Sequence, residues 1–121
     1  MSRASYLPVP QQRLLEDWGR TLRRMFHGEV PYQVGSSTQH ADYRDVDVRI
    51  IMDDDAHARL AAIVAIPRLN VTLSLWGQQV TGLPIDCQVQ QMTAANEQYH
   101  AHRRNPLGLS NWDTDERLVL G

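Results

Sequence analysis

Two stretches of this sequence alternate polar and apolar residues, and this pattern constrains the fold more than any other feature of the chain. Side chains of a strand point alternately to opposite faces, so Asp45 to Met52 and Ile85 to Gln90 each read as a strand with one polar and one apolar side. The polar sides carry Asp45, Asp47 and Arg49 in the first stretch and Asp86, Gln88 and Gln90 in the second. The apolar sides carry Val46, Val48 and Ile50, and Ile85, Cys87 and Val89. Both patterns predict a sheet that buries one face.

Helical periodicity appears between and around these stretches. Apolar residues recur at three- and four-residue spacing from about Gln11 to His27, where Gly28 ends the pattern. We expect further helices from the Asp53-Asp54-Asp55 run to about Val64, over Arg68 to Val80, and over Met92 to His102, and a short strand over Tyr32 to Val34. We expect Asn105-Pro106 to break the last helix and the final fifteen residues to be irregular. The pattern predicts an α+β (α/β) fold with a small mixed β-sheet flanked by helices.

The size of the chain favours a single domain. Its 121 residues suffice for one hydrophobic core, which we place at about residues 10–92, followed by a C-terminal helix and tail over 93–121. No apolar run reaches the roughly 20 residues that span a bilayer, and Cys87 is the only cysteine. We therefore expect a cytoplasmic protein with no membrane segment.

Charge gives little indication of a partner. The net charge is −2, and all twelve basic residues are Arg, which a GC-rich coding sequence explains without any function. The acidic run Asp53-Asp54-Asp55 is typical of a helix N-terminus, where the cap and first turn favour carboxylates. Neither feature by itself predicts nucleic-acid or metal binding.

The polar sides of the two predicted strands carry the candidate chemistry. If the strands are neighbours, the carboxylates of Asp45, Asp47 and Asp86 meet and repel one another. A divalent cation relieves that repulsion most directly, and Mg²⁺ prefers one or two carboxylates together with substrate phosphates. The pattern therefore predicts a magnesium site that also takes a phosphate-bearing ligand.

A glycine-serine pair lies upstream of these aspartates. Gly35 lets the backbone approach a ligand closely, and Ser36 adds a hydroxyl donor. A helix that starts there would direct its N–H groups at an anion. We predict that this pair binds the phosphates of a nucleotide.

The order of these motifs resembles the DNA polymerase β-like nucleotidyltransferase superfamily, in its minimal form. The resemblance rests on Val34-Gly35-Ser36, on Asp45-Val46-Asp47-Val48, and on Asp86 within Leu83-Pro84-Ile85-Asp86-Cys87, and it covers roughly residues 10–92. It implies the nucleotidyltransferase fold. It also implies that Gly35, Ser36 and Ser37 bind a nucleoside triphosphate, that Asp45 and Asp47 bind two Mg²⁺ ions (Mn²⁺ as a substitute), and that Asp86 binds the catalytic one.

The activity that the resemblance implies is transfer of a nucleoside monophosphate from the triphosphate to a hydroxyl group, with release of pyrophosphate. The acceptor is a protein, an RNA or a small molecule. Asp86 is also expected to help deprotonate the acceptor hydroxyl. The best candidates for contacting an acceptor are Tyr99, Arg103 and Arg104, because aromatic and basic groups together stack bases and contact phosphates. The competing interpretation of that segment is a helix C-terminus that carries cations.

A second hypothesis belongs to a different class. Only eight residues separate Ser36 from Asp45, no arginine follows the glycine-serine pair closely, and Arg49 shares the acidic side, where it can replace a metal's charge by pairing with Asp47. These features favour a catalytically inactive, antitoxin-like module that binds a helical protein partner. A homodimer is compatible with either hypothesis. Cys87 and Trp18, Trp76 and Trp112 are expected to be structural, in the core or at a subunit contact.

Overall fold

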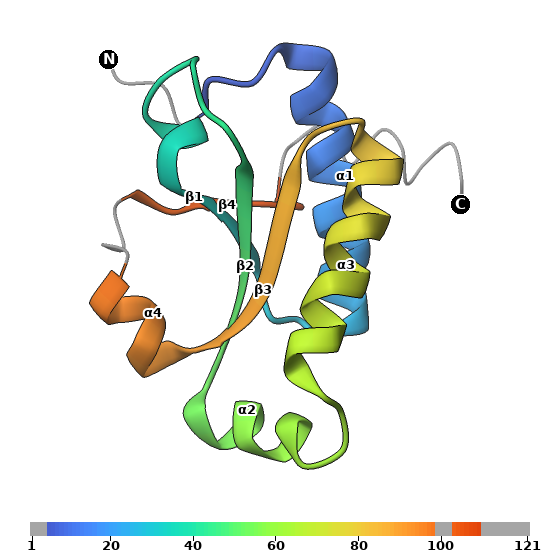
Figure 1. Cartoon of the computed structure of the whole chain (residues 1–121), viewed down its shortest axis with the longest axis vertical. Coiled ribbons are helices and arrows are strands. Elements are labelled where there is room, and N and C mark those ends of the chain that lie inside the picture. Colours follow the sequence, from blue (N-terminus) through green and yellow to red (C-terminus); the bar gives the residue numbers. More distant parts are fainter. Residues whose placement is uncertain (1–4, 99–102, 110–121) are drawn as a thin grey trace.

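The computed structural model describes residues 5–98 and 103–109, which form one mixed sheet with helices on both sides (Figure 1). The elements follow in the order α1 (Val9–Met25), β1 (Pro31–Val34), the 3-10 helix η1 (Gly35–Thr38), β2 (Val46–Met52), α2 (Asp54–Ala61), α3 (Ile66–Thr81), β3 (Ile85–Gln91), α4 (Met92–Gln98) and β4 (Asn105–Pro106). The spatial strand order is β3-β2-β1-β4. β2 and β3 are parallel, whereas β1 is antiparallel to both β2 and β4. The predicted fold class, a small mixed sheet flanked by helices, is confirmed.

The hydrophobic core lies between the sheet and the helices α1 and α3, which Figure 1 shows on the same side of the sheet. The apolar sides of β2 and β3 face these helices, as the alternation predicts: Val46, Val48, Ile50, Ile85, Cys87 and Val89 are all buried. Trp18 of α1 is 2% exposed and meets Trp76 of α3 edge to face, with ring centroids 5.8 Å apart. A Cβ on Gly77 would lie 2.6 Å from the Trp18 ring, so the absence of a side chain there lets the two helices pack closely.

α3 also lies along the outer edge of β3. Three of its polar side chains, four residues apart, reach the backbone of that strand. The Asn70 side-chain oxygen accepts a hydrogen bond from Val89 N (2.8 Å), the Ser74 hydroxyl accepts one from Cys87 N (2.8 Å), and the Gln78 amide donates to Ile85 O (3.0 Å). These bonds satisfy backbone groups that no strand pairs with on this side.

The boundaries of the elements differ from the predicted ones in several places. The first helix begins at Val9 and ends at Met25, β2 begins at Val46 after Asp45, and α2 ends at Ala61 rather than near Val64. The predicted helix over Met92 to His102 is described only to Gln98, because residues 99–102 lie outside the described part. Residues 110–121, including Trp112, lie outside it as well.

The segment after α4 contributes a short strand to the sheet and a side chain to the core, which we did not predict. Asn105-Pro106, expected only to break a helix, forms β4, which pairs with Tyr32 and Gln33 at the edge of the sheet. Asn105 donates from its side-chain amide to the buried Gln33 Oε1 (2.9 Å). The next residue, Leu107, has no regular secondary structure, as predicted, but it is fully buried and belongs to the hydrophobic core.

The acidic run at the start of α2 is a helix N-terminus, as predicted, but its capping differs in detail. Asp53 is the N-cap residue and makes no side-chain capping hydrogen bond, while Asp54 and Asp55 occupy the first turn. The Asp54 carboxylate instead accepts hydrogen bonds from the backbone N (3.1 Å) and hydroxyl (2.5 Å) of Thr93. Asp54 therefore links α2 to the start of α4.

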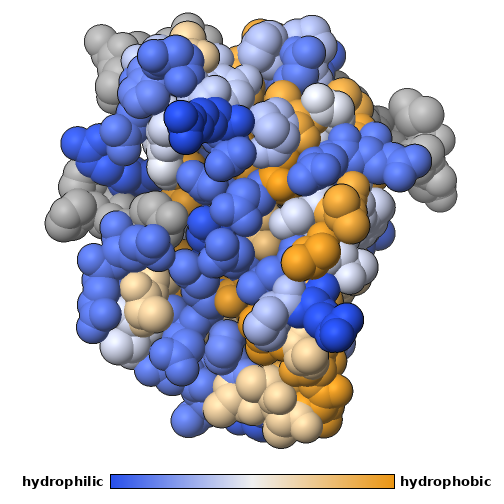
Figure 2. Space-filling view, in the orientation of Figure 1, coloured by the Kyte–Doolittle hydropathy of each residue, from blue (hydrophilic) through white to orange (hydrophobic). Residues whose placement is uncertain are grey.

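Hydrophobic and hydrophilic side chains are distributed unevenly over the molecular surface. In Figure 2 hydrophobic side chains gather over α3, and hydrophilic ones cover the opposite side of the view. The exposed apolar residues of this region include Ile63, Val71 and Leu75. Within the described part, no single helix is long and apolar enough to cross a membrane. The helices α2 and α3, which are bent by 95° relative to each other, have that length and composition only when they are taken together.

Candidate functional site

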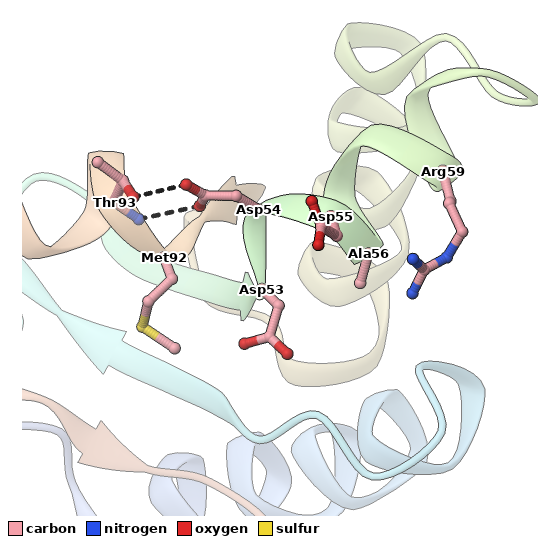
Figure 3. A pocket seen from close by; sticks show the side chains of 7 residues that line it. All are labelled: Asp53, Asp54, Asp55, Ala56, Arg59, Met92 and Thr93. Carbon is pink, nitrogen blue, oxygen red and sulfur yellow. Dashed lines mark hydrogen bonds between the residues drawn. The ribbon is translucent and has the colours of Figure 1, made fainter.

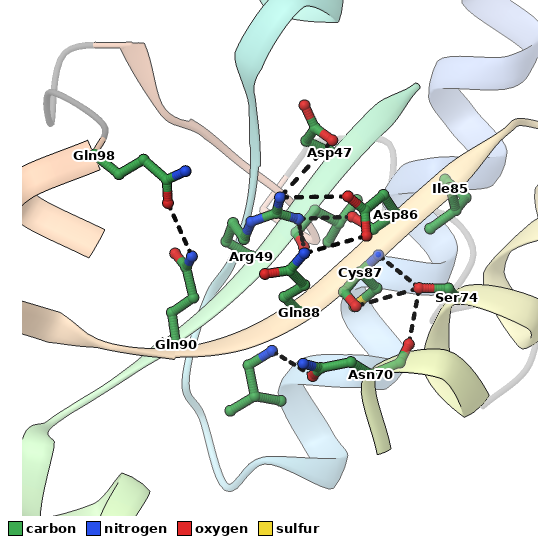
Figure 4. Close-up of polar contacts among 12 residues, drawn as sticks. Asp47, Arg49, Asn70, Ser74, Ile85, Asp86, Cys87, Gln88, Gln90 and Gln98 are labelled. Carbon is green, nitrogen blue, oxygen red and sulfur yellow. Dashed lines mark hydrogen bonds and ion pairs between the residues drawn. The ribbon is translucent and has the colours of Figure 1, made fainter. Parts of the chain in front are cut away.

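The sheet brings two of the predicted aspartates together. Asp47 of β2 and Asp86 of β3 are direct partners in the parallel register, and both point to the face opposite the core (Figure 4). Their side chains are 20% and 42% exposed. The alternation in the sequence predicts this juxtaposition, provided that the two strands are neighbours, which they are.

Gly35 lies directly beside this pair. Val34, the last residue of β1, is the register partner of Asp47, so the chain leaves β1 next to the carboxylate. Gly35 has φ +75°, and a Cβ at this position would overlap Asp47 Oδ2. Only glycine combines this backbone conformation with this close approach. The glycine-serine pair and the aspartate pair therefore belong to one site.

The two serines after Gly35 have different surroundings. Ser36 is half-buried, and its carbonyl accepts hydrogen bonds from Gln39 N and His40 N. Ser37 is buried, and its hydroxyl accepts a hydrogen bond from the Gln33 side chain (2.9 Å). The Ser37 hydroxyl thus stabilises the turn from inside, whereas Ser36 is the better placed of the two to meet a ligand.

Asp45 lies one residue before β2 and is exposed. Its charge is near enough to Asp47 to contribute to the pKa of that residue. Within the described residues, no group of three or more His, Cys, Asp or Glu side chains has the arrangement of a metal-ion site. The structure therefore gathers the Asp47 and Asp86 carboxylates in register and leaves Asp45 at the rim.

Arg49 lies between the two carboxylates. Its side chain is 5% exposed, and its Nη2 is 3.8 Å from Asp47 Oδ1 and 3.5 Å from Asp86 Oδ2 (Figure 4). Its Nη1 donates hydrogen bonds to the carbonyl oxygens of Val48 (3.0 Å) and Asp86 (2.8 Å). The sequence predicts the pairing with Asp47. The additional contact with Asp86 follows from the parallel register, which the sequence does not specify.

The electrostatics of the site favour neutralisation of Asp47. Burial, the largest cause, raises the pKa of this carboxyl above its ordinary value, and the negative charges of Asp86 and Asp45 raise it further. Arg49 acts in the opposite direction and lowers the pKa, but it does not outweigh burial. A carboxylate in this situation gains from any additional cation that approaches it.

The segment around Arg104 lies on the same face of the sheet. The Arg104 guanidinium is 5.9 Å from the ring centroid of Tyr32 and donates a hydrogen bond to Asn96 Oδ1 of α4 (2.7 Å). Tyr32 is the register partner of Arg49, so it lies two positions along β1 from the partner of Asp47. Arg103 is exposed, and Tyr99 lies outside the described residues.

We did not predict Tyr32 as a site residue. The signal was present, because Tyr32 and Val34 are two residues apart and must lie on one face of β1. Recognising it required the register between β1 and β2, which depends on tertiary structure.

A second concave region lies at the start of α2 and α4 (Figure 3). It is lined by Asp53, Asp54, Asp55, Ala56, Arg59, Met92 and Thr93. Asp54, its most constrained carboxylate, is held by Thr93, as described above. The acidic run thus lies at the N-terminus of α2, as predicted, while the hydrogen bonds of Asp54 to Thr93 were not predicted.

Cys87 is a core residue, as predicted. It is fully buried on the side of β3 that faces the helices, and burial raises the pKa of its thiol to about 12. At neutral pH the thiol stays protonated and is a poor nucleophile.

Comparison with known proteins identified no relative. No protein-family model, curated protein or solved structure matches the chain.

Proposed function

We propose that this protein is a metal-dependent nucleotidyltransferase, which transfers a nucleoside monophosphate from a nucleoside triphosphate to a hydroxyl group. The proposal rests chiefly on one observation: the Gly35 backbone lies against the Asp47 carboxylate, which itself lies opposite Asp86. A close backbone approach suited to phosphates and a pair of carboxylates suited to a cation are thus in contact.

The residues of the site are suited to a hard divalent cation. Asp47 and Asp86 offer carboxylate oxygens, the ligand type that Mg²⁺ prefers, and both side chains are partly exposed. They would hold Mg²⁺, or Mn²⁺ in its place, together with Asp45 from the rim. The ion would stabilise negative charge that develops on the oxygens of the reacting phosphate.

The chain itself would position the two substrates. The Gly35-Ser36 turn would bind the triphosphate through backbone N–H groups and the Ser36 hydroxyl. Asp86, the more exposed of the paired carboxylates, would accept the proton of the acceptor hydroxyl. Arg104 and Tyr32 lie on the same face and would contact the acceptor, which is a protein, an RNA or a small molecule.

The test is label transfer from each of the four α-³²P-labelled nucleoside triphosphates with Mg²⁺. The acceptors are the protein itself, total tRNA and a cell lysate. We expect transfer by the wild type and its loss in Asp47→Asn. The matched control is Asp55→Asn, because Asp55 is exposed in the first turn of α2, an element that carries none of the site residues. Equal transfer by the wild type and Asp47→Asn would refute the proposal.

One observation favours a second candidate function, a non-catalytic module that binds a helical protein partner. Arg49 already supplies a positive charge between Asp47 and Asp86. In that case the guanidinium supplies, beside these two carboxylates, the positive charge that a metal ion would otherwise supply. A nucleoside triphosphate with Mg²⁺ should raise the melting temperature of an enzyme, by binding only the folded state, and leave that of the binding module unchanged.

A further inference from the structure

The Arg49 guanidinium is hydrogen-bonded to the backbone of two strands. Its Nη1 donates to the carbonyl oxygens of Val48 and Asp86 at 3.0 and 2.8 Å, which are ordinary hydrogen-bond distances. The side chain is 5% exposed, so the guanidinium is enclosed by the fold rather than extended into water. It is therefore a fixed part of the site and not a mobile counter-ion.

The contacts of Arg49 with the carboxylates are looser. Nη2 lies 3.8 Å from Asp47 Oδ1 and 3.5 Å from Asp86 Oδ2, beyond the roughly 2.7–2.9 Å of a charge-assisted hydrogen bond. Both carboxylates keep acceptor capacity for another partner. The other Asp47 oxygen, Oδ2, packs against the Gly35 backbone, so closely that a Cβ at residue 35 would overlap it.

The position of the guanidinium limits where a second cation can go. A divalent ion that bridged Asp47 and Asp86 would lie against a positive charge already placed between them, and like charges at such short range repel strongly. An ion held by Asp47 together with the exposed Asp45, rather than between Asp47 and Asp86, avoids that contact. Before any nucleotide binds, three carboxylates and one guanidinium leave a net charge of −2, which one divalent ion balances.

We propose that Arg49 takes the place of one of the two divalent ions, so that the site binds a single metal ion together with the nucleotide. This inference rests on the proposed nucleotidyltransferase function and changes the expected number of ions from two to one. The remaining ion is held by Asp47 and Asp45, and not between Asp47 and Asp86. The guanidinium supplies the positive charge beside Asp86.

The number of bound ions tests the inference without any turnover. Mn²⁺ is added to the full chain in the presence of saturating α,β-methylene analogues of the four nucleoside triphosphates, and the free ion is counted by electron paramagnetic resonance. We expect one bound Mn²⁺ per wild-type chain and two in Arg49→Gln. Glutamine retains an amide donor and removes the charge. The matched control is Arg44→Gln, which removes an exposed charge next to Asp45 and should leave the count at one.

Each other outcome overturns a defined claim. Two ions in the wild type, or one in both the wild type and Arg49→Gln, overturn the role of Arg49 and leave the proposed function standing. Two ions in Arg44→Gln show that overall charge, not the position of Arg49, sets the number. No binding of analogue or ion by any variant overturns the proposed function itself. If Arg49→Gln fails to fold, Arg49→Met, which also removes the charge, is used; it should bind two ions, and one would refute the role of the charge.

Discussion

The two faces of the sheet are built from the same strands and have opposite properties. On the face toward α1 and α3, every side chain contributed by β2 and β3 between Val46 and Ile50 and between Ile85 and Val89 is apolar and buried. On the other face the same strands present the charged side chains of Asp47, Arg49 and Asp86, of which the two carboxylates are partly exposed. The alternation of a strand thus separates the residues that stabilise the fold from those that are free to do chemistry.

The two faces of the sheet differ in burial, but one residue of the open face is buried as well. Arg49 belongs to the open face but is almost completely buried, because neighbouring strands and their carbonyl groups surround its side chain. We expect substitutions on the helix-covered face to lower the free energy of unfolding, and substitutions on the open face to change mainly the charge balance of the site.

The largest expected effect is on the helix-covered face. Trp18→Ala removes a side chain that is 2% exposed and packs on Trp76 and Gly77, so we expect a loss of about 3–5 kcal/mol in the free energy of unfolding. Urea denaturation measures it. Val9→Ala, at a residue 61% exposed, should change stability by less than about 0.5 kcal/mol. A similar small change for Trp18→Ala would contradict the packing between α1 and α3.

An intermediate effect is expected where α3 meets β3. Asn70→Ala leaves the buried Val89 N–H without its acceptor, which costs about 1–3 kcal/mol. Hydrogen exchange at the Val89 amide should accelerate more than at neighbouring amides of β3. Thr72→Ala on the same helix is the control, because the Thr72 hydroxyl bonds only to the preceding helical turn and is exposed. Unchanged protection of Val89 would show that the Asn70 contact is not formed in solution.

A smaller effect of opposite sign is expected on the open face. The pKa of Asp47 is raised in the folded state, mainly by burial, so the folded protein favours the neutral carboxyl. Its stabilising contribution is present below the ordinary pKa of 3.8 and is lost as the pH rises through the raised value. Asp47→Asn should therefore be more stable than the wild type at pH 7, and the difference should shrink toward pH 3. Denaturation at both pH values tests this, with Asp42→Asn as the control.

The smallest effect belongs to the exposed link between α2 and α4. Hydrogen bonds from Thr93 lower the pKa of Asp54, so its contribution is present above pH 3.8 and is lost as the pH falls through the lowered value. Asp54→Asn should lower the melting temperature slightly at pH 7 and have no effect in strong acid. Asp55→Asn, which lies in the same helical turn, serves as the comparison. A larger loss for Asp55→Asn would show that charge at the helix end, not Thr93, matters.

The sequence predicts those features that depend on local periodicity. The strands around Asp47 and Asp86, the helix of Trp18 and the fold class all follow from the spacing of apolar residues. β4 was not predicted, because two residues that include a proline carry no strand pattern and pair only through the tertiary position of β1. Similarly, the bonds of Asp54 to Thr93 join residues 39 apart, and no local rule indicates them.

The same limit applies to the candidate site. The sequence predicts that Asp45, Asp47 and Asp86 come together if their strands are neighbours. The register pairs Asp47 with Asp86 and Gly35 lies against Asp47, whereas Asp45 is exposed, one residue before β2. The sequence does not predict that Arg49 contacts both carboxylates or that the Arg104 guanidinium lies over the Tyr32 ring. Both contacts depend on which residues are partners across strands. The nucleotide and the metal ions remain predictions.

The polar ladder of Asn70, Ser74 and Gln78 along β3 has a consequence for how this molecule can associate with others. An exposed strand edge recruits strands from other chains, and this is a common route both to specific complexes and to aggregation. Here the backbone groups of Ile85, Cys87 and Val89 are already bonded to α3, so a foreign strand would first have to displace a helix. A protein that binds this side of the molecule must therefore recognise the side chains on the surface of α3, and β3 is protected from growth of the sheet.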